Sequence, residues 1–315
     1  MIKVEGISKR YPGHTAVDNI SFEVEKGQIV GFLGPNGAGK TTTMRILTCF
    51  MPPTSGTANV AGYDVLENPL EVKRRIGYLP ETPPLYPEME VAEYLTFVGK
   101  LKGLSGDNLK KRVAEVSEKC NVADVSQKLV SKLSKGYKQR VGLAQAIIHN
   151  PDVLILDEPT SGLDPKQIHE TRDLIKGLAG EHTIILSTHI LPEVEQICER
   201  VVIISRGKLV ATDTMESLKN RMHGSAVIGV TVETPSESGL VQEKLERVAG
   251  VSRVILKETL EGGFAFEVES LQGRRVQADL ARAVVEAGWN LTELRPVSLS
   301  LEEVFLQLTA TEASA

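Results

Sequence analysis

Several kinds of residue are scarce in this chain of 315 residues. It has three cysteines, Cys49, Cys120 and Cys198, and no CxxC pair, which argues against a disulfide framework or a zinc site and fits a reducing compartment. No stretch reaches the roughly 18 consecutive apolar residues that cross a membrane, and the first residues lack the apolar core of a signal peptide. We therefore expect any association with a membrane to come through a partner.

An excess of charge of one sign is also lacking. Lys and Arg total 36 and Asp and Glu total 41, for a net charge of −5, so the balance gives no support for general binding to nucleic acid. Hydrophobic residues make up 41 %, which is enough for ordinary cores and excludes a disordered chain. The length suggests two domains rather than one.

The most informative stretch is a glycine-rich loop that joins an apolar run to a helical pattern. The motif GxxxxGK followed by Ser or Thr is filled by Gly34, Gly39, Lys40 and Thr41. Glycines let successive backbone N–H groups turn toward one anion, and the helix that follows adds its positive dipole end. Lys40 adds a charge that can reach the β- and γ-phosphates, and the Thr41 hydroxyl is placed to ligate Mg²⁺.

A chance glycine-rich turn is the alternative, and the surrounding pattern disfavours it. Residues 29–33 read as a strand and 41–47 as a helix, which is the context in which this motif binds phosphates. The sequence therefore predicts a nucleotide site formed by Gly34, Pro35, Asn36, Gly37, Ala38, Gly39, Lys40, Thr41 and Thr42.

The first 26 residues alternate apolar and polar side chains, which is typical of an antiparallel hairpin or meander. Tyr11 lies in a loop of this segment, just ahead of the phosphate-loop strand. An aromatic ring there could stack on a nucleotide base. A rim tyrosine that packs on its own hairpin is an equally good interpretation of the spacing.

The middle of the chain interrupts the alternation of strands and helices. Residues 57–63 and 76–81 read as strands, and a proline-rich loop follows the second. Residues 91–120 are helical by pattern, with a break at 103–106. We expect a helical subdomain over about residues 90–150.

Two carboxylates follow the next apolar run. Residues 153–156 are typical of a strand buried on both faces of a parallel sheet. Asp157 and Glu158 come at its carboxyl end, where open α/β sheets bind ligands. The next apolar strand, at 183–186, is closed by His189. A helix is also expected at 165–179, strands at 201–205 and 209–212, and a capped helix at 213–222.

The pattern changes after residues 223–225, which look like a domain boundary. Beyond them the order is strand, helix, strand, strand, helix, strand, the split-βαβ or ferredoxin-like arrangement, at 226–232, 239–248, 251–257, 263–268, 274–287 and 290–295. A last helix at 299–308 carries one apolar face, which we expect to pack on its own domain or on a second copy. The predicted domains are therefore residues 1–222 and 226–315.

Five motifs in this order resemble those of the ATP-binding cassette (ABC) family. They are Tyr11, Glu81, the segment Leu133-Ser134-Lys135-Gly136-Tyr137-Lys138-Gln139, the pair of segments 154–159 and 161–164, and His189. The resemblance covers about residues 2–222 and is specific, since the LSxGxxQ segment does not occur in kinases or G proteins. The ending RPVSLSLEEVFL at 295–306 resembles the tail of exporter-type cassettes, a group associated with drug, lipid, copper-assembly and gliding-motility export.

The resemblance implies an α/β fold, the phosphate-loop NTPase cassette. Such a cassette has a mixed sheet core, an antiparallel β subdomain and a helical subdomain, to which this chain would add a small α+β ferredoxin-like domain. The implied activity is hydrolysis of ATP with Mg²⁺. Asp157 would hold Mg²⁺ through water beside Thr41, and Glu158 would polarise the attacking water. His189 and Lys40 would contact the γ-phosphate.

The resemblance also implies a second copy of the chain. Ser134 and Gly136 would meet the γ-phosphate of an ATP bound to that copy, and Asp164 would lie across the same seam. Gln139, from the same LSxGxxQ segment, is a further candidate for the nucleotide site.

Two residues depart from the family pattern. Glu81 stands where the family has a loop glutamine; its carboxylate can ligate Mg²⁺ as a hard oxygen donor, and it adds negative charge near the triphosphate. Lys135 stands where the second glycine of LSGGQ is usual, and it either adds positive charge near the partner's nucleotide or is merely solvated.

We therefore expect the ATP-hydrolysing subunit of a membrane exporter. Two copies would close around two ATP molecules, and the loop from Glu81 to Met89 would pass the motion of reopening to a separate transmembrane permease. The chain would lie on the cytoplasmic side of the cell membrane, held there by the permease. The alternative is a soluble cassette ATPase acting on ribosomes or DNA. Those proteins usually carry two cassettes or a long coiled-coil insertion, whereas this sequence has one cassette, no heptad run and no basic tail.

Overall fold

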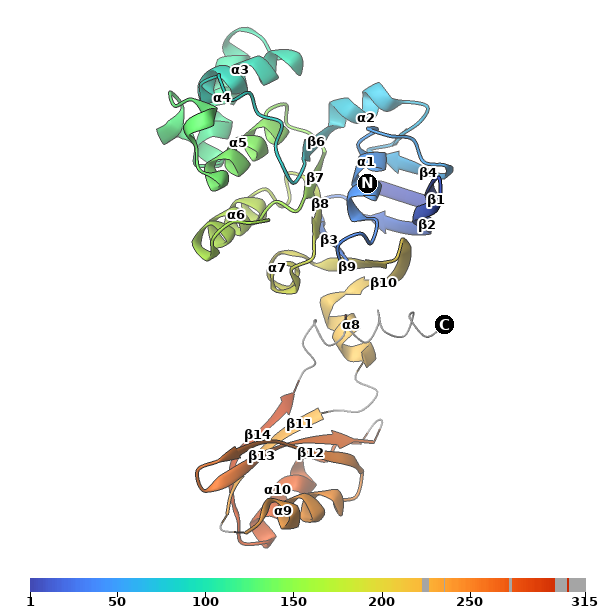
Figure 1. Cartoon of the computed structure of the whole chain (residues 1–315), viewed down its shortest axis with the longest axis vertical. Helices are drawn as coiled ribbons and strands as arrows, with labels where there is room; N and C mark the ends of the chain where they lie inside the picture. Colours follow the sequence, from blue (N-terminus) through green and yellow to red (C-terminus); the bar gives the residue numbers. More distant parts are fainter. Residues whose placement is uncertain (223–226, 235, 272–273, 298–304, 306–315) are drawn as a thin grey trace. The chain divides into compact units, whose positions relative to one another are not determined.

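The computed structural model describes residues 1–222, 227–234, 236–271, 274–297 and 305. They fall into two compact units that divide between Met215 and Glu216, and Figure 1 shows the elements of each. Separate apolar cores support the two units. Helix α8 (Met215–Met222), which the sequence pattern placed at the end of the first domain, lies almost entirely in the second unit.

The first unit is built on a six-stranded sheet of order β10-β9-β3-β8-β7-β6. The strands from β9 to β6 are parallel, and β10 pairs antiparallel with β9 at one edge. Every residue of β3, β7 and β8 is buried, which explains their continuous apolar runs and confirms the buried strand predicted at 153–156. The bounds are β3 Ile29–Leu33, β6 Ile76–Leu79, β7 Val153–Asp157, β8 Thr183–Thr188, β9 Arg200–Ser205 and β10 Lys208–Thr214.

A second, antiparallel sheet of order β2-β1-β4-β5 includes the predicted N-terminal hairpin. The single strand expected at 57–63 is wrong, because Ala61 and Gly62 both adopt positive φ (52° and 87°) and turn the chain between two strands. The side chains that alternate inward join the core of the first unit. The strands are β1 Ile2–Tyr11, β2 His14–Val24, β4 Ser55–Val60 and β5 Tyr63–Asp64.

The helical subdomain expected over about residues 90–150 is present as α3 (Val91–Leu101), α4 (Gly106–Lys119) and α5 (Lys135–Ile147). Gly103, between α3 and α4, and Gly106, the first residue of α4, both have positive φ, which confirms the predicted break. The other helices of this unit are α1 Lys40–Leu47, α2 Pro69–Arg75, α6 Pro165–Gly177 and α7 Leu191–Ile197. Helices α2 and α7 were not predicted, since seven residues are too few for a clear helical period.

The second unit has the βαββαβ order predicted for it. Strands β11 to β14 form one antiparallel sheet of order β12-β13-β11-β14, and helices α9 and α10 lie against one face of that sheet (Figure 1). Buried residues of β11, β13, α9 and α10 form its core. The elements are β11 Val227–Glu233, α9 Ser238–Glu246, β12 Val251–Leu260, β13 Gly263–Ser270, α10 Gln277–Glu286 and β14 Asn290–Val297. The helix predicted at 299–308 lies outside the described residues, apart from Phe305.

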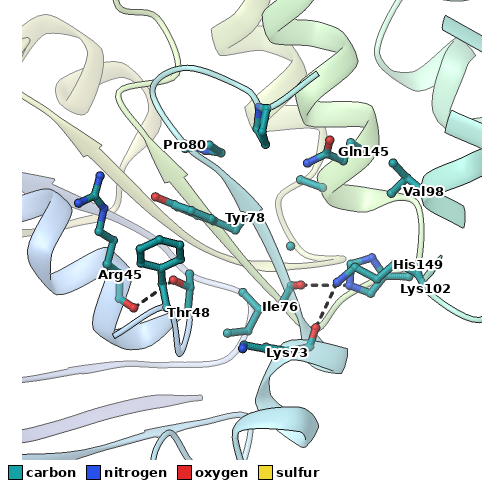
Figure 2. A pocket seen from close by; sticks show the side chains of 14 residues that line it. Arg45, Thr48, Lys73, Ile76, Tyr78, Pro80, Val98, Lys102, Gln145 and His149 are labelled. Carbon is teal, nitrogen blue, oxygen red and sulfur yellow. Dashed lines mark hydrogen bonds between the residues drawn. The ribbon is translucent and has the colours of Figure 1, made fainter. Parts of the chain in front are cut away.

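A cavity of about 510 Å³ opens in the first unit where the helical subdomain meets α1, α2 and β6. We call it the subdomain groove (Figure 2). Most of its described lining is apolar or aromatic, and Arg45, Lys73 and Lys102 reach it while no Asp or Glu among the described residues lines it. His149 Nε2 bonds the Ile76 carbonyl oxygen at 3.0 Å. Its Nδ1 is buried and has no partner among the described residues.

Candidate nucleotide site

The glycine-rich loop runs from the end of β3 to the start of α1, as predicted. Two glycines are required by close backbone contacts. A Cβ on Gly34 would lie 2.4 Å from the Ile204 carbonyl oxygen, and a Cβ on Gly39 would lie 2.5 Å from that of Ala16. Gly39 also has φ of 106°, a conformation that side chains disfavour. The loop is therefore pressed onto neighbouring backbone with its N–H groups at the N-terminus of α1.

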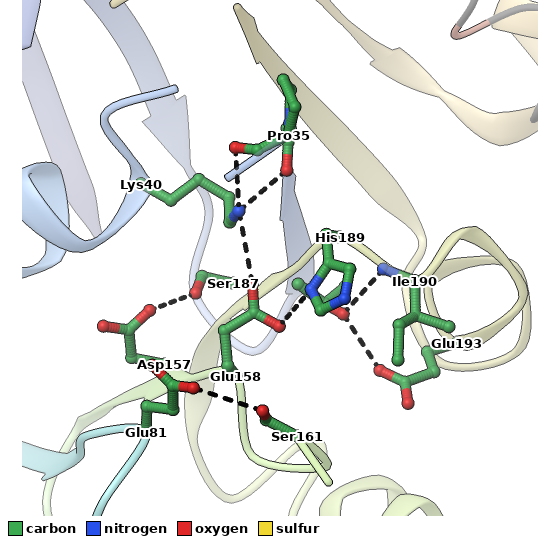
Figure 3. A network of polar contacts seen from close by, with 12 residues as sticks. Pro35, Lys40, Glu81, Asp157, Glu158, Ser161, Ser187, His189, Ile190 and Glu193 are labelled. Atoms are coloured by element: carbon green, nitrogen blue, oxygen red, sulfur yellow. Dashed lines mark hydrogen bonds and ion pairs between the residues drawn. The ribbon is translucent and has the colours of Figure 1, made fainter. Parts of the chain in front are cut away.

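Lys40 is buried at the centre of the site, with 5 % of its surface exposed. Its Nζ donates to the carbonyl oxygens of Gly34 at 2.7 Å and Pro35 at 3.3 Å. It also forms an ion pair of 3.3 Å with Glu158 Oε1 (Figure 3). The ammonium group is thus held across the mouth of the loop, where an incoming phosphate can take it over from these partners.

Glu158 joins Lys40 to His189. Its second oxygen, Oε2, lies 2.8 Å from His189 Nδ1, so one carboxylate bridges the two nitrogen groups (Figure 3). The backbone of Glu158 adopts φ of 49°, a left-handed conformation that is uncommon for a residue with a side chain. Its N–H donates to the Ser187 carbonyl oxygen at 3.0 Å. This turn directs the carboxylate away from the strand and into the site.

Asp157 lies beneath Glu158 at the end of β7. Ser187 Oγ donates to its Oδ1, and the Thr41 hydroxyl lies close enough to favour the charged carboxylate by hydrogen bonding. Burial raises the pKa of Asp157 above its ordinary value, against the lowering effect of these two hydrogen bonds. The contact of Ser187 with Asp157 was not predicted from the sequence. Its position at the end of the strand next to β7, in register with Asp157, was the signal available.

The predicted residues converge on one cavity of about 490 Å³. Those that line it are Tyr11, Asn36, Gly37, Gly39, Lys40, Thr41, Thr42, Glu81, Glu158 and His189. Gly34, Pro35, Ala38 and Asp157 support it without lining it. His14, Ala16 and Ser161 also line it and were not predicted; the first two are neighbours of Tyr11 in the hairpin, and Ser161 begins the SGLD segment.

The residues proposed to hold Mg²⁺ offer the oxygen donors that this ion prefers. The Thr41 hydroxyl lies close enough to the Asp157 carboxyl to lower its pKa, and Glu81 faces the same cavity, where its Oε1 accepts from Ser161 Oγ at 3.2 Å. No cluster of three or more His, Cys, Asp or Glu in the described part of the chain could hold a metal by itself. These residues therefore fit an ion that takes its other ligands from water and phosphate.

Tyr11 lies at the rim of the cavity, with 42 % of its surface exposed. Its hydroxyl donates to Met51 Sδ at 3.4 Å, and Lys9 Nζ lies 5.6 Å from the ring centre. The ring thus contacts its own chain and borders the cavity at once. Both interpretations of this tyrosine remain consistent with its position.

The predicted residues of the LSxGxxQ and SGLD segments do not line the cavity of their own chain. Ser134 and Asp164 are the N-caps of α5 and α6, and their side chains accept from Tyr137 N at 3.3 Å and Gln167 N at 2.9 Å. A Cβ on Gly136 would lie 2.6 Å from Gln167 Oε1. Gln139 is buried, and its Nε2 donates to the Glu81 carbonyl oxygen at 3.4 Å.

Lys135, the departure in the LSxGxxQ segment, lies over the SGLD segment of its own chain. Its Nζ is 2.3 Å from where a Cβ of Gly162 would be, and Gly162 has φ of 67°. The glycine therefore makes room for the lysine. The lysine side chain nevertheless remains exposed to solvent.

A parallel sheet with a phosphate loop, a buried lysine and strand-end carboxylates defines a phosphate-loop nucleoside triphosphatase. Residues 17–161 match the family model described as ABC transporter. The ABC transporter ATP-binding protein YxlF of Bacillus subtilis, described as uncharacterized, is 36 % identical over 309 residues, which are 98 % of this chain and 99 % of YxlF. The chain therefore belongs to the ABC transporter family, and it binds and hydrolyses ATP.

Other relatives include proteins named for resistance to antibiotics. The daunorubicin/doxorubicin resistance ATP-binding protein DrrA of Streptomyces peucetius is 33 % identical, over 99 % of this chain and 93 % of DrrA. Among solved structures, the cassette MJ0796, a dimer bound to ADP and Pi, is 25 % identical and has a TM-score of 0.63. The match covers 68 % of this chain and 99 % of MJ0796.

Proposed function

We propose that this chain powers export through a separate membrane protein by hydrolysing ATP in the cavity above its phosphate loop. The observation that carries this is the Glu158 carboxylate, held 3.3 Å from Lys40 Nζ and 2.8 Å from His189 Nδ1 at that cavity. It combines a base for the attacking water with two positively polarised groups for the transferred phosphoryl group. Phosphoryl transfer needs little more than such positioning and charge stabilisation.

The residues divide the work as follows. Lys40 leaves Glu158 and the loop carbonyls for the β- and γ-phosphates, which frees Glu158 to accept a proton from water. His189 retains the other oxygen of Glu158 and keeps the carboxylate oriented. Thr41, Asp157 and Glu81 are proposed to hold Mg²⁺, which supplies charge neutralisation to the phosphates when bound.

A second copy would account for three predicted residues that do not line the cavity of their own chain. Ser134 caps α5 with an exposed side chain at the helix N-terminus, a position suited to a phosphate from outside the chain. We propose that Ser134, Gly136 and Asp164 face the nucleotide of a second copy. In a two-fold dimer each such contact occurs twice.

This arrangement is tested with Glu158→Gln, which removes the base and keeps the shape. The full-length variant should retain ATP and shift to a dimer in gel filtration with ATP and Mg²⁺. Adding Ser134→Arg should abolish the shift while each chain still binds ATP. Ser105→Arg is the matched control, since Ser105 is the N-cap of α4 and makes no capping bond. If the monomer of the double variant loses ATP, Ser134 serves its own site and the two-copy arrangement is wrong.

We propose that the subdomain groove receives a cytoplasmic segment of the membrane protein. None of the helices in the described part of the chain combines the length and apolar character that a membrane span requires. The groove is lined by Pro80 and Pro84, which flank the start of the loop expected to transmit motion. Its three cations favour an amphipathic segment that carries acidic side chains. Export, and a position at the cytoplasmic face of the membrane, are supported by relatives named for antibiotic resistance.

We also propose that the nucleotide unit folds without the C-terminal unit, because all strands of its six-stranded sheet precede Met215 and the described cluster of its core that packs on the phosphate-loop strand ends at Ile204, with Leu209 packed against it. A chain that ends after Met222 should stay soluble and bind ATP with unchanged affinity. Isothermal titration with ATP analogues checks this. A truncated chain that is folded but does not bind nucleotide would contradict the proposed boundary.

A further inference from the structure

Glu193 is a buried carboxylate one helical turn beyond His189. It lies on α7, and only 2 % of its surface is exposed. The adjoining residues of the helix, Val194 and Ile197, are buried and apolar. Figure 3 shows that the Glu193 side chain turns back toward the end of β8, where His189 begins the loop into α7.

The carboxylate controls the backbone on both sides of His189. Glu193 Oε2 accepts from Thr188 Oγ1 at 3.1 Å, and the same Oγ1 accepts from Ile190 N at 3.0 Å. A backbone N–H can only donate a hydrogen bond, so the Thr188 oxygen accepts from Ile190. The Thr188 hydroxyl must therefore point its hydrogen at Glu193, which leaves its lone pair for the Ile190 N–H. The three groups close a small loop of which His189 is the central residue.

The burial of this carboxylate does not stabilise the folded chain. Glu193 Oε1 is buried and has no hydrogen-bond partner among the described residues. A buried carboxylate with an unsatisfied oxygen destabilises the folded chain, and an apolar side chain of similar size would not carry that penalty. An unsatisfied buried group in a native structure calls for a functional reason.

His189 needs such support because its ring is held by few contacts. Its side chain is 43 % exposed, and its Nδ1 contacts Glu158 Oε2. The reach of the ring to that carboxylate is consequently set by the backbone from Thr188 to Ile190. A displacement of about 1 Å in a reacting group can lower turnover by as much as a hundredfold.

We propose that Glu193 is a positioning residue for ATP hydrolysis, which acts through Thr188 to fix the loop that carries His189. The inference rests on the role proposed above for His189. It assigns Glu193 no contact with nucleotide, water or metal. Its removal should therefore reduce turnover and leave nucleotide binding nearly intact.

The test compares Glu193→Ala, Glu193→Gln and Thr188→Val in the full chain. Glu193→Ala and Thr188→Val should each lower kcat about tenfold to a hundredfold, with KM for ATP changed less than about threefold. Glu193→Gln should stay within about threefold of the unaltered kcat, because the amide oxygen can still accept from Thr188. The Ala and Val changes combined should be no worse than the poorer single change, since both break one hydrogen bond.

Thr171→Val is the matched control for loss of a buried hydroxyl. Thr171 is buried on α6, and its Oγ1 has no partner among the described residues, so this variant should keep its kcat. Thermal unfolding of every variant separates loss of fold from loss of positioning. If Glu193→Ala unfolds, Thr188→Val still tests the inference, because it replaces a hydroxyl with a methyl group and keeps the shape of the side chain.

Three outcomes overturn the inference. The first is an unchanged kcat in folded Glu193→Ala or Thr188→Val. The second is a Glu193→Gln variant as slow as Glu193→Ala. The third is a His189→Ala variant that hydrolyses ATP normally, because the role proposed for His189 then fails and this inference fails with it. If His189→Ala is slow while folded Glu193→Ala is normal, only the inference about Glu193 is overturned.

Discussion

The first unit contains two cavities of nearly equal volume, about 490 Å³ at the phosphate loop and about 510 Å³ at the subdomain groove. The first has glycine backbone and side chains of both charges. The second has mostly apolar walls, and the charged residues among its described lining are all cations. The first suits a polyanion with a metal ion, and the second suits a protein segment with an apolar face. The two cavities thus have similar volumes but suit chemically different ligands.

The same two elements border both cavities. Helix α1 contributes Lys40 to the phosphate cavity and Arg45 to the groove, one and a half turns farther along. The chain after β6 gives Pro80 to the groove and Glu81 to the phosphate cavity. We therefore expect a nucleotide that draws Glu81 inward to move a wall of the groove as well. The two cavities therefore share wall elements, although the ligands that suit them differ.

The largest effect expected is that of Lys40→Ala. It removes the charge that the β- and γ-phosphates need, so hydrolysis should fall at least about a hundredfold, and ATP affinity should fall with it. Lys73→Ala, a cation of the groove, is the matched change and should leave both quantities unaltered. Steady-state hydrolysis and nucleotide titration check the pair. Equal losses in the two variants would erase the distinction between the cavities.

The phosphate cavity was predictable because its chemistry is local in sequence. The loop from Gly34 to Thr42 and the pair Asp157 and Glu158 each occupy one short segment, at a position that a parallel sheet exposes. Ser187 and Glu193 were missed because they act through other side chains. Ser187 matters through register with Asp157 on another strand, and Glu193 through a turn that no periodicity reveals.

The groove could not be predicted at all. Its lining comes from α1, α2, β6, α3 and α5, which are far apart in sequence, and packing alone brings them together. Much of the fold was nonetheless readable, since the buried parallel strands appear as apolar runs and the βαββαβ unit as alternating patterns. The errors fall on short elements such as α2 and β5, where too few residues define a period.

A smaller effect is expected from reversing the charge of the groove. Lys73→Glu with Lys102→Glu should leave hydrolysis by the isolated chain within about twofold, because neither residue lines the phosphate cavity. Binding to the separate membrane permease should weaken at least about tenfold, since like charges now face each other. Copurification after coexpression measures this.

The control for that experiment carries the same charge change elsewhere. Lys110→Glu with Lys111→Glu alters two exposed residues of α4 that do not line the groove. This variant should copurify normally. Equal loss from both double variants would show that total charge matters rather than the groove.

The smallest effect expected concerns His149 and pH. Burial, followed by the charge of Lys102, lowers the pKa of His149 from 6.5 to about 4. Between these values the unfolded chain binds the proton more readily than the folded chain. Stability is therefore fully present above pH 6.5 and is lost as the pH falls toward about 4.

From pH 7 to pH 5 this one histidine should cost about 1–2 kcal/mol of unfolding free energy, because the shift covers roughly 1.5 pH units below 6.5 at about 1.36 kcal/mol each. His149→Gln keeps a donor for the Ile76 carbonyl oxygen and cannot take up the proton, so its loss between pH 7 and pH 5 should be smaller by that amount. Urea unfolding at the two pH values measures the difference. His169→Gln changes an exposed histidine on α6 and should retain the full loss. If His149→Gln loses as much as the unaltered chain, then the groove does not hold this imidazole neutral. Its buried Nδ1 would then carry a proton rather than a free lone pair.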